Sequence, residues 1–99
     1  MTERQRTLWE RIVQAARAAG TASIVYETDW LGWLPFGQYQ WFQCNGKDVG
    51  DLPAGWALSD VKALEAAGRL HRTGEWKDPE YSEHEKIFFT IGAPAADVV

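Results

Sequence analysis

Cysteine and histidine residues are the first candidates for chemistry in this chain. Cys44 lies between Gln43 and Asn45, which neither lower a thiol pKa nor supply a catalytic base. His71 and His84 have too few other ligand-type residues near them in a metal-binding spacing. We therefore expect a structural cysteine in a strand and no metal site.

Other catalytic patterns are also missing from the sequence. Ser59 is better explained as a helix cap than as a nucleophile. Residues 83–85 read Glu-His-Glu, but on a strand these side chains alternate, so at most two of them share a face. The sequence has no glycine-rich phosphate loop or dinucleotide fingerprint, and no carboxylate pair is marked out for acid–base chemistry. The sequence predicts a protein that is not an enzyme and needs no cofactor.

Tryptophan is the unusual residue type, with six in the chain. Residues 30–42 hold six aromatic side chains among thirteen residues. Glycine and proline interrupt residues 30–37, which predicts an aromatic loop whose full length cannot reach the interior. Exposed aromatic side chains are typical of the energetic centres of protein interfaces. Each buried aromatic removes about 150–250 Å² from water, and the aromatic residues that we expect in the core are Trp9, Trp41 and Trp56.

The charge balance of the chain is acidic. Fourteen Asp and Glu residues against ten Lys and Arg residues give a net charge of −4 at pH 7. This balance argues against general attraction to nucleic acid or anionic lipid, and no basic residue lies between Thr28 and Asn45 to favour a membrane surface. Acidic residues near the C-terminal hairpin would orient a basic partner. The residues predicted to bind a partner protein are Trp30, Trp33, Phe36, Tyr39, Trp76, Glu75, Asp78 and Glu80.

Composition predicts one folded domain. Apolar residues make up 45% of the 99 residues and charged residues 24%, as in ordinary globular proteins. We expect a single α+β domain over residues 1–91 and a flexible C-terminal tail over 92–99. A single cysteine forms no internal disulfide, and residues 1–6 are charged with no apolar segment behind them, which predicts a cytoplasmic protein without a signal peptide.

Hydrophobic periodicity predicts the elements. Thr2 and Gln5 fit a capping box at the start of the first helix, Gly20 suits its left-handed end, and Arg4, Arg6, Arg11 and Arg17 fall mostly on its solvated face. Asn45-Gly46 favours a hairpin turn, and Asp78-Pro79-Glu80 favours another turn. The expected order is a helix over 2–19, strands over 21–28 and 38–44, a loop or short strand within 47–55, a helix from 59 to 67, and strands over 69–76 and 85–91.

The second helix and the strands after it carry a further pattern. Ser59 is expected to cap this helix, Val61, Leu64 and Ala67 to form its buried face, and Gly68 to end it. In the last strand, alternation places Ile87, Phe89 and Ile91 on one face and Phe88 and Thr90 on the other.

This helix and hairpin resemble the recognition helix and wing of winged-helix domains. The match runs from residue 58 to 72 and on to 88–90, about a third of the chain, and rests on Leu64, Gly68, Leu70, Ile87 and Phe89. The resemblance implies a transcription regulator whose helix reads the major groove of DNA. The residues that it would assign to nucleic acid are Lys62, Arg69, Arg72 and Lys77.

Three functions remain open at this point. The preferred hypothesis is a small acidic binding module, an inhibitor or adaptor of the size and charge of anti-CRISPR and immunity proteins, whose partners include proteins that handle nucleic acid. The alternative is the winged-helix regulator. The third is a subunit whose aromatic segment forms an oligomer interface, such as a homodimer.

Overall fold

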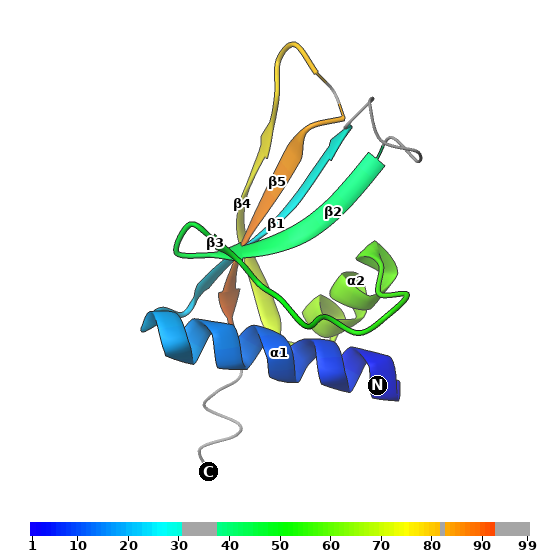
Figure 1. Cartoon of the computed structure of the whole chain (residues 1–99), viewed down its shortest axis with the longest axis vertical. Helices are drawn as coiled ribbons and strands as arrows, with labels where there is room; N and C mark the ends of the chain where they lie inside the picture. The colour runs from blue at the N-terminus through cyan, green and yellow to red at the C-terminus, as the bar shows by residue number, and fades with distance from the viewer. Residues whose placement is uncertain (31–37, 82, 93–99) are drawn as a thin grey trace.

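A computed structural model of the chain describes residues 1–30, 38–81 and 83–92 (Figure 1). Over these residues the chain forms two α-helices and a five-stranded antiparallel sheet, which confirms the α+β class. The elements are α1 (Glu3–Ala19), β1 (Ser23–Trp30), β2 (Gln38–Cys44), β3 (Lys47–Asp48), α2 (Leu58–Ala66), β4 (Leu70–Lys77) and β5 (Glu85–Ile91).

Helix α1 forms as its local sequence predicts. The backbone N–H of Gln5 donates to Thr2 Oγ1 at 3.1 Å, and the Gln5 side chain accepts from the Thr2 N–H at 3.1 Å. Gly20 ends the helix at a φ of 68°, a conformation that glycine adopts without steric cost. The buried stripe of the helix consists of Leu8, Ile12 and Ala16.

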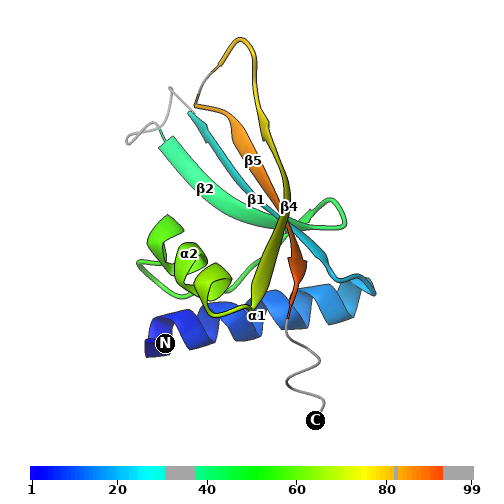
Figure 2. The same cartoon turned by 180° about the vertical axis from the view of Figure 1, so that it is seen from behind.

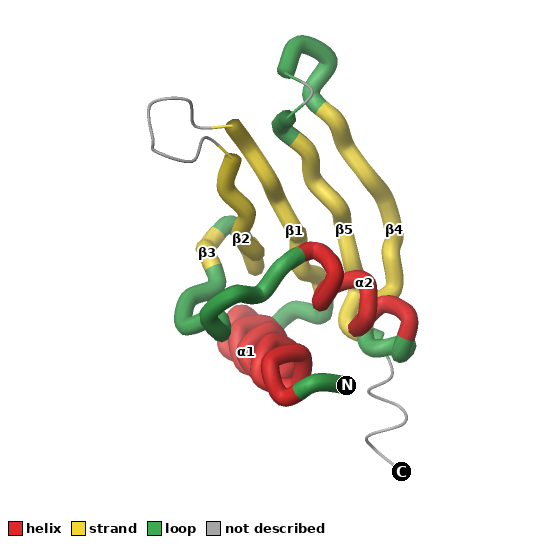
Figure 3. The backbone as a smooth tube through the Cα atoms, turned by 90° about the vertical axis from the view of Figure 1, so that its right-hand side faces the viewer, coloured by secondary structure: helices red, strands yellow, loops and turns green. Residues whose placement is uncertain are grey.

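The sheet has the strand order β3-β2-β1-β5-β4, so β1 pairs with both β2 and β5. Both helices pack on the same face of the sheet, near one end of its long strands (Figures 1 and 2). The strands continue past the helices to a second end, where β1 and β4 finish and β2 and β5 start (Figure 3). We call this second end the distal end, and the face without helices the helix-free face.

The core lies between the helices and the sheet. Phe42 and Phe89 are its largest fully buried side chains, and Tyr26 packs edge-on against Phe42 with ring centroids 5.5 Å apart. The alternation predicted for β5 is confirmed, since Phe89 lies in the core while Phe88 faces the other way. Among the described residues, the buried apolar residues of the core are Leu8, Ile12, Ala16, Ile24, Tyr26, Phe42, Cys44, Val61, Leu64, Leu70 and Phe89.

The three tryptophans expected in the core lie at or beyond its border. Trp9 and Trp56 are only half-buried and pack against the outside of the core cluster. Trp41 is half-buried on the opposite side, because the register pairs it with Glu27 on the helix-free face. The physical reason is shape. Medium-sized aliphatic and phenylalanine side chains fill the thin layer between helix and sheet, whereas the larger indoles of Trp9 and Trp56 lie at its edges.

The start of α2 differs from the prediction. The helix begins at Leu58 with Ala57 as its N-cap, so Ser59 is not the cap. Asp60 performs this role from inside the first turn, with its Oδ2 accepting the Ala57 N–H at 3.0 Å. The buried face contains Val61 as expected, but Ala67 is exposed because the helix has already ended at Ala66.

Arg4 is exposed, as expected from the helix pattern, but its guanidinium also reaches a buried partner. Its Nε and Nη2 donate to the two carboxylate oxygens of Asp60 at 3.0 and 3.1 Å. Gln5 adds a third hydrogen bond to Asp60 at 3.1 Å. The first turns of α1 and α2 are therefore joined through one carboxylate that is only 1% exposed.

The described turns follow local sequence signals. Asn45 and Gly46 take φ values of 56° and 82° between β2 and β3, which confirms the predicted hairpin turn. After β4, Asp78 Oδ1 accepts the N–H groups of Glu80 and Tyr81 at 2.8 and 3.1 Å. The β4–β5 register shifts between Arg72 and Gly74, which marks a β-bulge.

The C-terminal tail predicted from residue 92 lies largely outside the described residues. Gly92 is buried, and its N–H donates to the Arg69 carbonyl at 2.7 Å. The predicted binding residues Trp33 and Phe36 are also outside the described ranges. Of the two described helices, neither has the length and apolar character needed to cross a bilayer.

Candidate binding surface

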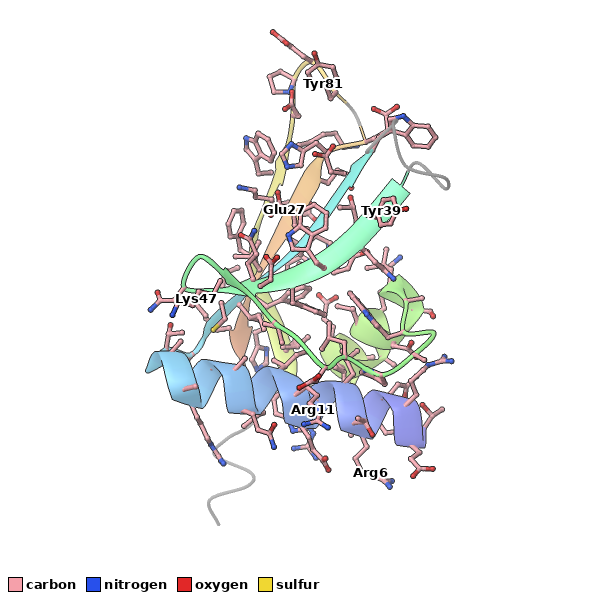
Figure 4. All side chains as sticks on the ribbon, viewed as in Figure 1. Arg6, Arg11, Glu27, Tyr39, Lys47 and Tyr81 are labelled. Carbon is pink, nitrogen blue, oxygen red and sulfur yellow. The ribbon has the colours of Figure 1, made fainter. Side chains whose placement is uncertain are left out.

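Exposed aromatic side chains gather at the distal end. Trp30 is 54% exposed at the end of β1, Trp76 is 39% exposed near the end of β4, and Tyr81 is 64% exposed in the following turn. Among the described residues, the one other large hydrophobic side chain that is exposed is Met1. Figure 4 shows Tyr81 at the tip of the β4–β5 hairpin, at the opposite end of the molecule from α1. Two segments distant in sequence, the end of β1 and the residues from Trp76 to Tyr81, thus bring aromatic rings to one end.

Carboxylates accompany these rings. Asp29 precedes Trp30 in β1, and Glu80 and Glu83 flank Tyr81 as exposed side chains of the turn. Asp78 orders the same turn through its hydrogen bonds to Glu80 and Tyr81. The distal end is therefore a surface of aromatic and acidic side chains together.

His84 ties the β4–β5 turn to the centre of the sheet. Its Nε2 lies 2.7 Å from Glu27 Oε2, and its Nδ1 lies 3.6 Å from Asp78 Oδ2. The hydrogen bond to Glu27 raises the pKa of His84, burial opposes the rise, and Asp29 and Asp78 add to it. Trp76 packs edge-on against the imidazole with centroids 5.0 Å apart. This arrangement favours an imidazolium held between carboxylates, although Glu27 itself is only 6% exposed.

This cluster does not have the arrangement of a metal site. Over the described ranges, no group of three or more His, Cys, Asp or Glu residues is placed to hold a metal ion. His71, the second histidine, is exposed on β4 opposite Thr90. The cluster is an ion-pair network that braces the distal end.

The helix-free face has an ordered row of side chains across four strands. Glu27 pairs with Trp41 of β2 on one side and with Lys86 of β5 on the other, and Lys86 pairs with Trp76 of β4. The row therefore reads Trp41, Glu27, Lys86, Trp76. Lys86 Nζ lies 5.4 Å from the centroid of the Trp76 ring, a cation–π distance. No local sequence pattern marks Glu27 or Lys86, because only strand register shows that they are neighbours.

The predicted partner-binding residues separate into two groups. Trp30, Trp76, Asp78 and Glu80 all lie at the distal end, where strand alternation places Trp30 on the helix side of the sheet and Trp76 on the helix-free face. Tyr39 is half-buried on β2, where it pairs with Asp29. Trp30 is the last residue of β1 rather than part of a loop, because the strand runs two residues beyond the predicted end.

Glu75 is engaged with a basic neighbour. Its carboxylate forms an ion pair with Arg72, and Arg72 also donates two hydrogen bonds to Glu65 at 3.1 and 2.9 Å. These bonds to Glu65 and Glu75 raise the pKa of Arg72.

Of the residues assigned to nucleic acid by the winged-helix resemblance, Lys62, Arg72 and Lys77 line one hollow between α2 and the sheet. Arg69 lies apart from them, beside Trp9. Lys77 Nζ lies 3.0 Å from Glu85 Oε1, and the Arg69 guanidinium lies 5.7 Å from the centroid of the Trp9 ring. Lys62 is exposed on α2. Acidic neighbours thus offset much of the positive charge that a phosphate backbone would need.

A groove lies between α2 and the sheet below the distal end. Two adjoining hollows of 510 and 340 Å³ share Leu58, Glu85 and Ile87 as lining residues. Tyr26 borders the smaller hollow, and its hydroxyl donates to Gln40 Oε1 at 2.8 Å. Burial, with a smaller contribution from Glu85, raises the pKa of Tyr26 to about 12, so this phenol stays protonated at neutral pH.

Cys44 lines a third hollow, of 290 Å³, beside the end of α1. Its side chain is 4% exposed, and burial raises the pKa of the thiol. A thiol in this state is a poor nucleophile.

Comparison with known protein families, curated proteins and solved structures finds no match for this chain.

Proposed function

We propose that the protein is a small acidic binding module that uses its distal end to occupy a surface of another protein, as an inhibitor or adaptor. The observation that carries the proposal is that Trp30, Trp76 and Tyr81 are all exposed and all lie at the distal end of the molecule. Aromatic side chains with an apolar body and a polar group dominate the energy of many protein interfaces. The β4–β5 hairpin presents Trp76 and Tyr81 at little entropic cost, because the hydrogen bond between His84 and Glu27 already holds its turn in place.

The acidic residues define the partner. Asp29, Asp78, Glu80 and Glu83 would meet a basic surface, which steers association and fixes orientation. A basic surface on a protein that handles nucleic acid is the expected target, because carboxylates can compete there for a phosphate site. The proposal contains no catalytic step, since Tyr26 and Cys44 both have raised pKa values that disfavour their reactive anions.

The test is capture of a partner from native lysate, with half of each sample treated with nuclease. We expect a protein in fixed ratio to the bait in both halves. The double variant Trp30→Ala/Tyr81→Ala should weaken its capture by about tenfold or more while leaving the circular dichroism spectrum unchanged. Unchanged capture by this folded variant would overturn the proposal.

A matched charge pair sharpens the experiment. Glu80→Lys reverses a charge at the distal end, and Glu10→Lys makes the same change on the exposed side of α1. We expect weaker partner binding for Glu80→Lys only. Equal loss in both variants would indicate a general charge effect instead of a distal binding surface.

Winged-helix DNA binding is the second candidate function. It is favoured by the way that α2 leads through Gly68, at a φ of 76°, directly into the β4–β5 hairpin with Leu70 and Phe89 buried. This candidate predicts a salt-sensitive complex with duplex DNA that Lys62→Ala or Arg72→Ala weakens. Recovery of nucleic acid in the capture experiment, with proteins lost after nuclease treatment, would favour it over the distal-end proposal.

A further inference from the structure

We propose that the helix-free face pairs with the same face of a second copy of this chain, about a two-fold axis that runs parallel to the strands between β1 and β5. This inference goes beyond the proposed function and does not depend on it. It concerns an adjoining surface that shares Trp76 with the distal end and whose central residues are Val25, Glu27, Lys86 and Phe88.

The helix-free face has the composition of a surface that another protein chain covers. Val25, Trp41 and Phe88 are half-buried there, and Trp76 is more than a third exposed. No described helix packs on this side of the sheet, as Figures 1 and 2 show. Contiguous apolar side chains on the open face of a sheet commonly mark an interaction site.

The order of the central row is what selects a second copy as the occupant. A two-fold axis along the strands reverses the lateral order of Trp41, Glu27, Lys86 and Trp76. Glu27 of one copy then faces Lys86 of the other, twice in each dimer, and Trp41 faces Trp76. The row therefore sets an acidic position against a basic one and an indole against an indole, with the Glu27 carboxylate 6% exposed and bonded to His84.

The neighbouring row obeys the same relation. Val25 and Phe88 are register partners in the next row, so each would face the other across the axis, and both are apolar. In that row Gly74 lies opposite Phe88 in β4, and it would leave space for Gln43 of the second copy.

The area of the helix-free face determines how strong a dimer we expect. Strands lie about 4.8 Å apart and side chains on one face recur about every 6.7 Å, so four strands and four rows cover about 500 Å² per copy. The two copies together would bury about 1,000 Å², near the lower limit for a specific interface. We therefore expect a dimer that dissociates on dilution. Its two distal ends would point the same way and present two binding surfaces side by side.

The first test measures mass in solution by sedimentation velocity over a wide concentration range. We expect a rise from the mass of one chain to that of two and no further. Lys86→Glu should remain a monomer at concentrations where the wild type is dimeric, because the new carboxylate would face Glu27 of the other copy. Lys62→Glu makes the same charge change on α2 and should still dimerise. A wild type that stays monomeric, or a dimer indifferent to Lys86→Glu, would overturn the inference.

A second measurement needs no variant and covers the case in which Lys86→Glu fails to fold. Wild-type protein is acetylated briefly at low and at high concentration, and lysine modification is read by mass spectrometry. We expect acetylation of Lys86 to fall at high concentration while that of Lys62 stays constant. Equal behaviour of the two lysines would contradict a dimer through the helix-free face. Partner capture through Trp30 and Tyr81 is scored separately, so failure of one proposal is distinguishable from failure of the other.

Discussion

The contact between His84 and Glu27 makes the stability of the fold depend on pH. Because the pKa of His84 is raised in the folded chain, folding is favoured by protonation of the imidazole. This contribution is complete below the usual histidine pKa of about 6.5 and is lost as the pH rises through the raised value. The relevant window therefore begins near the usual histidine pKa of about 6.5 and extends upward to the raised pKa of His84, above the range in which carboxylates titrate.

We predict that the free energy of unfolding falls as the pH rises through this window, and that His84→Gln removes part of the fall. Urea unfolding followed by tryptophan fluorescence at several pH values measures the effect. His71→Gln is the matched control, since His71 is exposed on β4 and should leave the wild-type profile unchanged. Identical profiles for the wild type and His84→Gln would contradict the conclusion that protonation of His84 stabilises the fold.

Asp60 is the second residue with a sharp consequence. Burial opposes its ionisation, but hydrogen bonds from Arg4, from the Ala57 N–H and from Gln5 outweigh burial and lower its pKa. We predict that Asp60→Ala destabilises the protein by about 2 kcal/mol, because it removes a helix cap and leaves a backbone donor unpaired. Asp48→Ala, at an exposed position in β3, should change stability by less than about 0.5 kcal/mol. Chemical denaturation of both variants gives the comparison.

At the scale of elements, the junction between the end of β5 and the start of β4 leaves the least room for an added side chain among the described glycines. A Cβ at Gly92 would lie 2.7 Å from the Gly68 carbonyl oxygen and would also collide with the His71 ring. We predict that Gly92→Ala costs about 1–3 kcal/mol by overpacking this junction. Gly50→Ala is the control, because nothing lies within 4 Å of its added Cβ. Thermal melting should separate the two variants, and equal melting temperatures would show that the junction yields without cost.

The lengths of the elements also explain why no described helix covers the distal end. The long strands β1, β2, β4 and β5 extend past α2, which has only nine residues. A helix of nine residues rises about 13 Å, whereas a strand of eight residues extends about 26 Å. Because the strands are longer than the helix, the distal ends of β1, β2, β4 and β5 lie outside the helical layer.

At the scale of the whole molecule, the net charge of −4 and the acidic distal end predict salt-sensitive association with the captured partner. We expect the association rate to fall by about tenfold between low and high ionic strength, with a smaller change in the dissociation rate. Stopped-flow mixing or surface plasmon resonance with the purified partner measures both rates. An association rate that is independent of salt would argue that the aromatic side chains alone drive recognition.

Local sequence signals by themselves determined most of the elements of this protein. The capping box of Thr2 and Gln5, the Asn45-Gly46 turn and the alternation over residues 87–91 each act within a few residues. Such short-range hydrogen bonds and periodicities are legible without knowing what packs against them. The exposure of Trp30 and Trp76 also agrees with a surface role for aromatic residues, although no sequence signal placed them at the same end.

Only the tertiary structure decided which groups meet. His84 and Glu27 are 57 positions apart, and the row from Trp41 to Trp76 joins four strands. Alternation assigns Phe88 and Phe89 to opposite faces, but both are apolar, so the pattern does not say which face the helices cover. That choice depends on long-range strand register and on the fit of α1 and α2 to one side. Those interactions are non-local, which is why the helix-free face and its charge row emerged from the structure alone.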